Sequence, residues 1–388
     1  MTKTPPSQVR AAWRAALCSA LVAGLLAACG SGHEDLRQRA GTDHYADGRF
    51  HNLDRDFALP DTSDVLAFQW SRLTRHMPAP TTDITPLVPD LGWLQGNRAE
   101  PSATWIGHAT VLVQIAGLNV LTDPQFSQRA SPVQWMGPKR LVPPAMSVAE
   151  LPDIDVVLIS HSHFDHLDEG SIRALAAKGD PLFLVPLGLE PLLREWGAHR
   201  VQALDWNEQT AVTGRHGVVK FDCVPARHWS RRGLFDRDRA LWAGWMMSGP
   251  DFRVYFAGDT GWDESLFNAL GERFAPVDMA LLPVGAYEPR DFMRNQHINP
   301  AEAVKVFQAL GARRGLGIHW ATFDLSDEAP DAPRRVLPAA LLAAGLPENA
   351  IALTRPGETL RPRAPVSIDL RGKSPRYPKR QWAKGEPR

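Results

Sequence analysis

The sequence of 388 residues predicts an α/β (α+β) fold in which two β-sheets pack face to face with helices outside them. Two observations favour this class. Short apolar runs recur from residue 103 onward, and several of them follow one another without a helix between them. Only the later runs alternate with helical stretches. This mixture favours two packed sheets over one doubly wound parallel sheet, in which helices separate the strands.

The individual elements follow from the pattern of apolar residues. We expect strands at 111–115, 120–122, 156–159, 182–185, 218–224, 254–257, 279–284 and 316–318. We expect helices at 171–178, 189–196, 263–274, 301–310 and 334–344. The sequence before residue 100 is polar, proline-rich and weakly periodic, with one further helix expected at 65–76. The predicted organisation is a signal peptide (1–28), a tether and irregular extension (29–100), a main domain (101–360) and a basic tail (361–388).

The first 28 residues have the composition of a secretory signal peptide. Three basic residues precede an apolar run of roughly fourteen residues that ends in small side chains. That run is shorter than the about 20 residues that a transmembrane helix needs. Leu26-Ala27-Ala28-Cys29 resembles a bacterial lipobox, which implies that Cys29 is lipidated and becomes the mature N-terminus. An ordinary signal peptide with an incidental cysteine is the alternative.

A lipidated Cys29 would place the protein at the bacterial cell envelope, anchored to a membrane on its periplasmic or outer-membrane side. Cysteine usage agrees with this location. The chain has three cysteines, of which Cys18 lies in the signal peptide and Cys223 in the main domain. A single cysteine in the main domain excludes an intramolecular disulfide there, so the hydrophobic core must stabilise the fold.

Charge is distributed unevenly along the chain. Of its 43 basic and 43 acidic residues, nine basic and two acidic residues lie in the tail 361–388. The rest of the mature chain is acidic and has no basic face interleaved with aromatic residues, so we expect no nucleic-acid partner. The tail is interpreted either as a solvated terminus or as a contact with anionic phospholipid headgroups. No feature of the sequence predicts an oligomeric state.

The segment Ser160–Asp168 carries the strongest functional signal. It directly follows a buried strand and contains His161, His163, Asp165 and His166 within six residues. Imidazole and carboxylate are ligands that suit zinc and neighbouring divalent metals. Residues i and i+2 of a loop face the same way, so His161 and His163 can bind one ion while the next two residues approach a second. The sequence therefore predicts a metal site; the alternative is a polar surface loop.

Three further candidates lie where predicted strands end. His228 follows 218–224, and His319 ends the strand 316–318. Asp259 lies between two glycines that permit a tight turn around its carboxylate. Sites built on sheets collect residues from strand ends. Each residue alone could be an ordinary turn or cap residue, but beside the histidine motif they are predicted to complete the metal site.

The motif His161-Ser-His-Phe-Asp-His166, followed in order by His228, Asp259 and His319, resembles the metallo-β-lactamase superfamily. The resemblance implies a four-layer αββα sandwich with two Zn²⁺ per chain at one edge. It also implies the ligands: one metal is bound by His161, His163 and His228, the other by Asp165, His166 and His319, and Asp259 bridges them.

Further motifs resemble one family within this superfamily, the N-acylphosphatidylethanolamine-hydrolysing phospholipases D. The likeness runs from about residue 104 to 323, with an echo at Gly48–Asn52, and rests on Thr104–Thr110, Leu121–Pro124, Phe126–Pro132, Met136–Arg140, Leu241–Trp245, Gly285–Arg290 and Gln296–His297. It implies a phosphodiesterase that releases N-acylethanolamine and phosphatidic acid from a membrane phospholipid. Trp135 stands where that family has a tyrosine, and the N-terminal extension is poorly matched.

The mechanism we expect is hydrolysis at phosphorus. Two divalent cations about 3.5–4 Å apart can bind one water between them. They lower the pKa of that water enough for it to form hydroxide at neutral pH. Asp165 and Asp259 are the predicted catalytic carboxylates, and His297 is expected to offset charge on the phosphoryl oxygens. Gln134 and Trp135, with His297, are the predicted substrate contacts.

Asp123 and His108 are interpreted either as partners that orient ligating side chains or as structural turn residues. Two other functions remain open from the sequence. The same site could hydrolyse another ester or a lactone, or the chain could be a non-catalytic surface lipoprotein whose metals only stabilise the fold.

Overall fold

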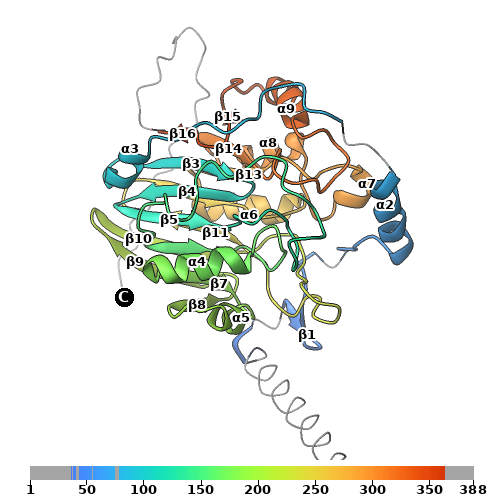
Figure 1. Ribbon diagram of the computed structural model, residues 1–388, viewed down its shortest axis with the longest axis horizontal. Helices are drawn as coiled ribbons and strands as arrows, with labels where there is room; N and C mark the ends of the chain where they lie inside the picture. Colours follow the sequence, from blue (N-terminus) through green and yellow to red (C-terminus); the bar gives the residue numbers. More distant parts are fainter. Residues whose placement is uncertain (1–35, 37, 41–42, 55, 75–77, 363–388) are drawn as a thin grey trace, which may run out of the picture.

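The computed structural model describes residues 36, 38–40, 43–54, 56–74 and 78–362 (Figure 1). The predicted signal peptide, Cys29 and all but two residues of the basic tail lie outside the described residues. Within the described part, two seven-stranded sheets form the body of the protein. The predicted α/β class with two large sheets is confirmed.

The first sheet has the strand order β16-β3-β4-β5-β6-β7-β8. Strands β3 to β5 are antiparallel neighbours, whereas β5 to β8 run parallel, so the carboxyl ends of the parallel strands meet at one edge. Its strands are β3 (Ser102–Gly107), β4 (Thr110–Ile115), β5 (Leu118–Thr122), β6 (Val156–Leu158), β7 (Leu182–Pro186), β8 (Val201–Leu204) and β16 (Thr359–Leu360).

The second sheet has the order β15-β14-β13-β12-β11-β10-β9. Strands β9 to β12 are antiparallel and β12 to β15 are parallel, which repeats the arrangement of the first sheet. Its strands are β9 (Gln209–Gly214), β10 (Gly217–Val224), β11 (Gly244–Ser248), β12 (Arg253–Phe256), β13 (Met279–Pro283), β14 (Arg314–Ile318) and β15 (Ile351–Ala352).

Helices cover the sheets on their outer sides. In Figure 1, α4 and α5 lie with the first sheet, while α6 and α8 lie with the second. The described helices are α2 (Thr62–Thr74), α3 (Leu91–Gly96), α4 (Glu169–Gly179), α5 (Glu190–Glu195), α6 (Glu264–Phe274), α7 (Arg290–Met293), α8 (Pro300–Ala309) and α9 (Ala332–Ala343). None of the helices in the described part of the chain combines the length and the apolar character that crossing a bilayer requires.

The core between the sheets is apolar and rich in tryptophan. Trp105 on β3 and Trp245 on β11 are fully buried, one from each sheet. The Trp245 indole N–H donates a hydrogen bond of 2.9 Å to the carbonyl of Ile159, the residue just before the histidine motif. A buried indole N–H needs such a partner, and here it ties the start of the motif in the first sheet to a strand of the second.

The N-terminal extension contains more regular structure than we predicted. Strands β1 (Tyr45–Ala46) and β2 (Arg49–Phe50) form a hairpin whose Phe50 is fully buried. The Phe50 N–H donates to the carbonyl of Asp238 at 2.7 Å, which docks the hairpin on the segment that follows β10. Periodicity does not reveal strands of two residues, so the sequence gives no signal for this hairpin.

Candidate metal centre

The metal-ligand candidates come from the ends of strands in both sheets. The segment with His161, His163, Asp165 and His166 follows β6; the other three follow strands of the second sheet, His228 after β10, Asp259 after β12 and His319 after β14. Asp168 ends the first segment by capping α4, because its carboxylate accepts the Ser171 N–H at 3.0 Å. All seven side chains predicted as ligands converge on one place, and His297 joins them.

Three histidine nitrogens form the first group. His161 Nε2 lies 2.8 Å from His163 Nδ1, and His228 Nε2 lies 3.2 Å from the same atom. These are the three residues expected to share one metal. Their rings meet edge to face, with centroids 4.6 to 5.1 Å apart, so the nitrogens point at a common centre.

The outer nitrogens of two of these rings, those of His228 and His161, have partners that fix the tautomer. His228 Nδ1 lies 2.9 Å from the carbonyl oxygen of Gln296, an acceptor only, so Nδ1 carries the proton. Ser160 Oγ donates to Asp123 at 2.5 Å and so accepts from His161 Nδ1 at 2.9 Å. Both Nε2 atoms therefore direct lone pairs at His163, an arrangement that a cation satisfies better than one shared proton.

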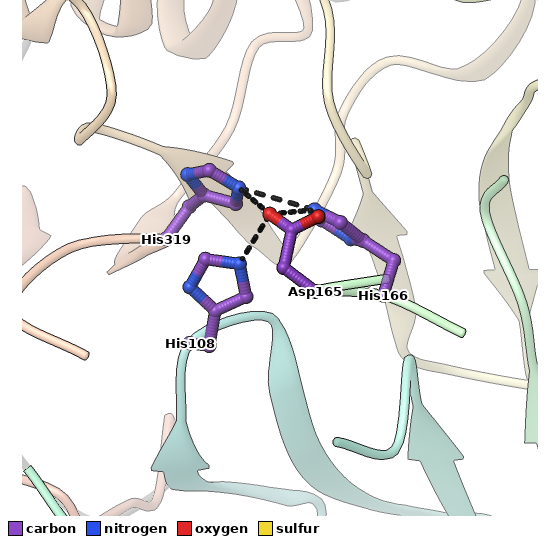
Figure 2. Close-up of side chains that lie close together, drawn as sticks. All are labelled: His108, Asp165, His166 and His319. Carbon is purple, nitrogen blue, oxygen red and sulfur yellow. Dashed lines mark hydrogen bonds and ion pairs between the residues drawn. The ribbon is translucent and has the colours of Figure 1, made fainter. Parts of the chain in front are cut away.

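The second group surrounds Asp165 (Figure 2). Its Oδ2 lies 3.3 Å from His319 Nε2 and 3.4 Å from His166 Nε2, and these two nitrogens are 3.1 Å apart. The outer nitrogen of His166, Nδ1, donates to Asp123 at 2.7 Å, so its Nε2 also presents a lone pair. His108 approaches the same carboxylate oxygen from the turn after β3, at 3.0 Å.

Asp259 lies between the two groups. Its Oδ2 is 3.1 Å from His166 Nε2 and 3.2 Å from His319 Nε2, and 3.9 and 4.0 Å from His228 and His161. The other oxygen, Oδ1, is buried and has no hydrogen-bond partner among the described residues. A carboxylate with one oxygen facing both groups and the other unpaired fits a bridging ligand.

Burial and charge set the protonation of the cluster. Burial lowers the pKa of His228 to about 3 and that of His163 to about 4, so both imidazoles are neutral, as metal ligands must be. Burial opposes the charged form of His319 as well, yet Asp259 and Asp165 raise its pKa to about 9. Despite burial, the pKa of Asp259 is held well below its ordinary value by His166 and His319. The carboxylates at the second group therefore carry negative charge that must be balanced, either by protons on the histidines or by a bound cation.

The backbone around the cluster is tightly constrained. His108, Asp123 and His319 all have positive φ, a region that residues with side chains rarely adopt. Gly258, with φ of 59°, has no room for a side chain, because a Cβ there would lie 2.5 Å from Cβ of Ser160. The predicted need for glycine beside Asp259 is therefore explained by close approach of the two sheets at this point.

Several contributing residues were not predicted. The Asn52 side chain accepts the His228 N–H at 3.0 Å and donates to the His228 carbonyl at 2.8 Å, which fixes the backbone of that residue. Ser160 and Gln296 orient ligands as described above. All three lie inside motifs that the sequence displays, but their roles depend on contacts between distant segments.

Of the three predicted substrate contacts, one lies at the ligand cluster and two lie in a separate loop. His297 belongs to the cluster, since its Nδ1 is 3.7 Å from Asp259 Oδ2 and its ring is 5.3 Å from that of His228. Gln134 instead accepts the Arg129 N–H at 3.0 Å within its own loop, and Trp135 is 75% exposed. The structure therefore does not join Gln134 and Trp135 to the cluster by any hydrogen bond that it describes.

Comparison with known proteins identifies the family. The beta-lactamase superfamily domain matches residues 118–320, which is more than half of the chain. All seven predicted ligands lie within that range. The chain belongs to the beta-lactamase superfamily. Together with the cluster of candidate metal ligands, this makes it a metal-dependent hydrolase with the metallo-β-lactamase fold, and the resemblance noted in the sequence is confirmed.

Relatives of this superfamily member include characterised and uncharacterised proteins. It is 42% identical over 229 residues to the N-acyl-phosphatidylethanolamine-hydrolyzing phospholipase D 1 of Caenorhabditis elegans, covering 58% of this chain and 64% of that protein, just under two thirds of its length. It is 39% identical over 334 residues to an uncharacterized protein of Mycobacterium tuberculosis, covering 84% and 86%. A solved structure, a possible metal-dependent hydrolase from Veillonella parvula, shares the fold with a TM-score of 0.55 at 19% identity, covering 68% of this chain and all of that one.

Proposed function

We propose that this superfamily member is a phosphodiesterase with two Zn²⁺ per chain that hydrolyses N-acylphosphatidylethanolamine-type phospholipids to N-acylethanolamine and phosphatidic acid. The observation that carries the proposal is the position of Asp259 Oδ2 between two groups of ligand atoms. The substrate class is supported by the 42% identity to the nematode phospholipase.

The residues fit two metal sites. His161, His163 and His228 would hold one ion, Asp165, His166 and His319 the other, and Asp259 both. Bound divalent cations supply an acidified water and neutralise charge on a phosphoryl group. Asp123 and the Gln296 carbonyl keep the outer ring nitrogens protonated, so that the inner nitrogens remain ligands.

The remaining polar groups have roles that the geometry supports. His297 is neutral, because burial lowers its pKa to about 3, and its Nδ1 has no hydrogen-bond partner among the described residues. In the proposed reaction it donates a hydrogen bond to a phosphoryl oxygen, where charge accumulates during attack. His108, at 3.0 Å from Asp165, holds that carboxylate in the orientation that the second site requires.

The decisive test is a lipid product profile from purified protein of known metal content. N-acylphosphatidylethanolamine in vesicles should yield N-acylethanolamine and phosphatidic acid. Turnover confined to a soluble lactone or another ester would favour the alternative substrate class. Metal-loaded protein without any hydrolysis would favour a structural role for the metals.

The metal content has its own test. Purified protein should contain close to two divalent ions per chain, with zinc dominant. His161→Ala and His319→Ala each remove one ligand, from different groups, so each should lower the metal content together with the activity. Full metal content in both variants would contradict the assigned ligands.

We also propose that a lipid on Cys29 anchors the protein to a membrane of the bacterial cell envelope, close to its phospholipid substrate. Cys29→Ala should abolish incorporation of labelled fatty acid and leave the protein unprocessed or soluble. Cys223→Ala is the control, because that thiol is buried in the core and unpaired. Equal fatty-acid incorporation after replacement of Cys29 would place the anchor elsewhere.

A further inference from the structure

The segment between His228 and β11 carries an unusual apolar tip. Leu234 and Phe235 are adjacent and have 78% and 83% of their surface exposed. Single exposed apolar residues are common, but two large neighbouring ones at the end of a loop are not. We call residues 233–236 the tip.

The shape of the tip is fixed by its own hydrogen bonds. The Asp236 carboxylate accepts the Gly233 N–H at 2.7 Å and the Arg232 N–H at 3.2 Å, which closes the turn. The Arg231 side chain donates to the Gly233 carbonyl at 2.8 Å. The two apolar side chains therefore protrude from an ordered turn.

Arginines surround the tip. An open cavity of about 650 Å³ is lined by the two apolar residues, one carboxylate and four arginines, namely Arg49, Arg231, Leu234, Phe235, Arg237, Asp238 and Arg239. The carboxylate, Asp238, is engaged with the Ser230 N–H and lies 3.4 Å from Arg237. The cavity is thus strongly cationic, on a protein whose main domain has more acidic than basic residues.

The tip is connected to the metal centre through the neighbouring Arg232, which is partly buried. Arg232 donates to the carbonyls of Ser162 and Leu167, at 2.9 and 2.6 Å, and its guanidinium lies 4.1 Å from the centre of the Phe164 ring. On the other side, Trp229 packs edge to face on His163 with centroids 4.4 Å apart. A group bound at the tip is therefore held beside the segment that carries the metal ligands.

We propose that the tip docks on an anionic phospholipid bilayer: Leu234 and Phe235 enter the acyl boundary while Arg49, Arg231, Arg237 and Arg239 bind headgroup phosphates. Apolar residues ringed by arginine match such a surface in both polarity and charge. The inference rests on the proposed function, since docking would bring the metal centre to a lipid substrate. It adds a binding surface distinct from the metal centre itself.

Site-specific fluorescence tests the docking in the full-length protein. A fluorescent amino acid is placed at position 235, and in a second protein at position 342, where Leu342 on α9 is 79% exposed. With vesicles of phosphatidylglycerol and a quencher-bearing lipid, the probe at 235 should be quenched several-fold more than the probe at 342. Equal quenching at both positions would show that only a tether holds the protein, and would overturn the proposal.

The contribution of the arginines to docking is tested by removing two of their charges. Arg231→Gln/Arg239→Gln should lower the insertion equilibrium measured at position 235 about 25-fold, because each arginine near an anionic surface is worth about fivefold. Arg173→Gln on α4 is the control and should change nothing. Vesicles of phosphatidylcholine alone should reproduce the loss. Shielding of the probe without vesicles, rising with protein concentration, would identify a second copy as the occupant instead and contradict the docking.

Hydrolysis separates the docking from the proposed function. Leu234→Ser/Phe235→Ser should slow hydrolysis in anionic vesicles about tenfold or more, because burial of each side chain is worth about that factor. With the substrate dispersed in detergent, the rate should equal that of Leu342→Ser and the wild type. Quenching at 235 without any turnover would leave the docking standing and reject the proposed substrate. If the wild type hydrolyses the substrate and Leu234→Ser/Phe235→Ser hydrolyses it at the same rate in anionic vesicles, the docking is rejected.

Discussion

Asp123 is the residue that aligns histidines in both groups of candidate metal ligands. Its carboxylate accepts from His166 Nδ1 at 2.7 Å and from the Ser160 hydroxyl at 2.5 Å, and Ser160 in turn accepts from His161. One buried side chain thereby fixes the tautomer of a histidine in each group. The sequence left Asp123 open between an orienting partner and a turn residue, and the contacts favour the orienting role.

Replacement of Asp123 tests that role. Asp123→Ala should lower metal affinity and hydrolysis about 10- to 100-fold, because His166 and His161 lose the acceptors that fix their inner lone pairs. Metal titration with a competing chelator measures the affinity. Asp123→Asn keeps the size and one acceptor oxygen and should be less impaired. If alanine lowered the melting temperature but left metal affinity unchanged, Asp123 would be a structural turn residue only.

Asp259 distinguishes catalysis from metal storage. Asp259→Asn keeps the side-chain size but loses the charge that faces both groups of ligands, so the spacing of two bound ions would no longer be set by a bridge. Hydrolysis should fall by about a hundredfold or more, since small misplacement of reacting groups has that effect. At least one ion should remain on the other ligands.

The control for this variant is its thermal melt, which should change little, because asparagine forms the same turn. A rate of lipid hydrolysis close to that of the wild type would contradict the two-metal mechanism. Asp259→Glu provides a second measurement in case Asp259→Asn loses its fold together with its activity. The glutamate keeps the negative charge but displaces it by one methylene. It should retain two ions and still lose most of its rate.

The candidate ligands were predictable because their spacing is local or tied to strand ends. His161, His163, Asp165 and His166 occupy one short segment, so chemistry and order alone singled them out as candidates, and they converge in the structure. Asn52 could not be identified in this way, because it contacts His228 across 176 positions of the chain. Trp135, which a motif suggested as a substrate contact, has an exposed side chain, and its contact with a substrate stays a prediction.

At the scale of elements, the sequence predicted eight strands from runs of apolar residues and missed others, including β3 and β11, which are buried as well. Strands β4, β5, β6, β7, β10, β12, β13 and β14 all overlap predicted ranges, since each contains a run of apolar residues. Strand β9 alternates exposed and half-buried residues at the edge of its sheet, so it shows no apolar run. Strands β15 and β16 have two residues each, and only pairing with distant strands defines them.

The β1–β2 hairpin is held by a buried histidine between two carboxylates. His44 Nδ1 lies 2.6 Å from Asp43 and Nε2 lies 2.7 Å from Asp205, so both ring nitrogens face acceptors and both need a proton. Burial disfavours the charged ring, but Asp205 and Asp43 together raise the pKa of His44 above its ordinary value. The hairpin is therefore attached by an imidazolium.

This attachment predicts a specific dependence of stability on pH. Because the pKa of folded His44 is raised above the unfolded value of about 6.5, its contribution is complete below that pH and is lost as pH rises through the folded pKa. The melting temperature of the wild type should exceed that of His44→Gln most at about pH 6, and the gap should shrink by about pH 9. Titrations at the metal centre affect both proteins equally. A gap that stays constant over this range would show that His44 acts as a neutral group.

At the scale of the whole molecule, the two sheets have different tasks that meet at one edge. The first supplies a single segment with four candidate ligands, and the second supplies His228, Asp259 and His319 from three separate strand ends. The site exists only when the sheets are packed on each other, and Trp245 connects them next to the first ligand. The core of buried residues is large and does not depend on the ligands, so the fold should survive without metal.

Metal removal should therefore lower stability without unfolding the protein. Ions that bind only the folded state, at concentrations a thousandfold above their dissociation constant, add about 4 kcal/mol to the free energy of unfolding. Dialysis against a chelator should lower the melting temperature by about 5–10 °C, leave the far-UV circular dichroism unchanged and abolish hydrolysis. Added zinc should restore both properties.

In His161→Ala the same dialysis should produce a smaller shift, because less metal is bound at the start. A shift as large as in the wild type would mean that the stabilising ion lies at another site, and unfolding on chelation would mean that the sheets cannot pack without the metals.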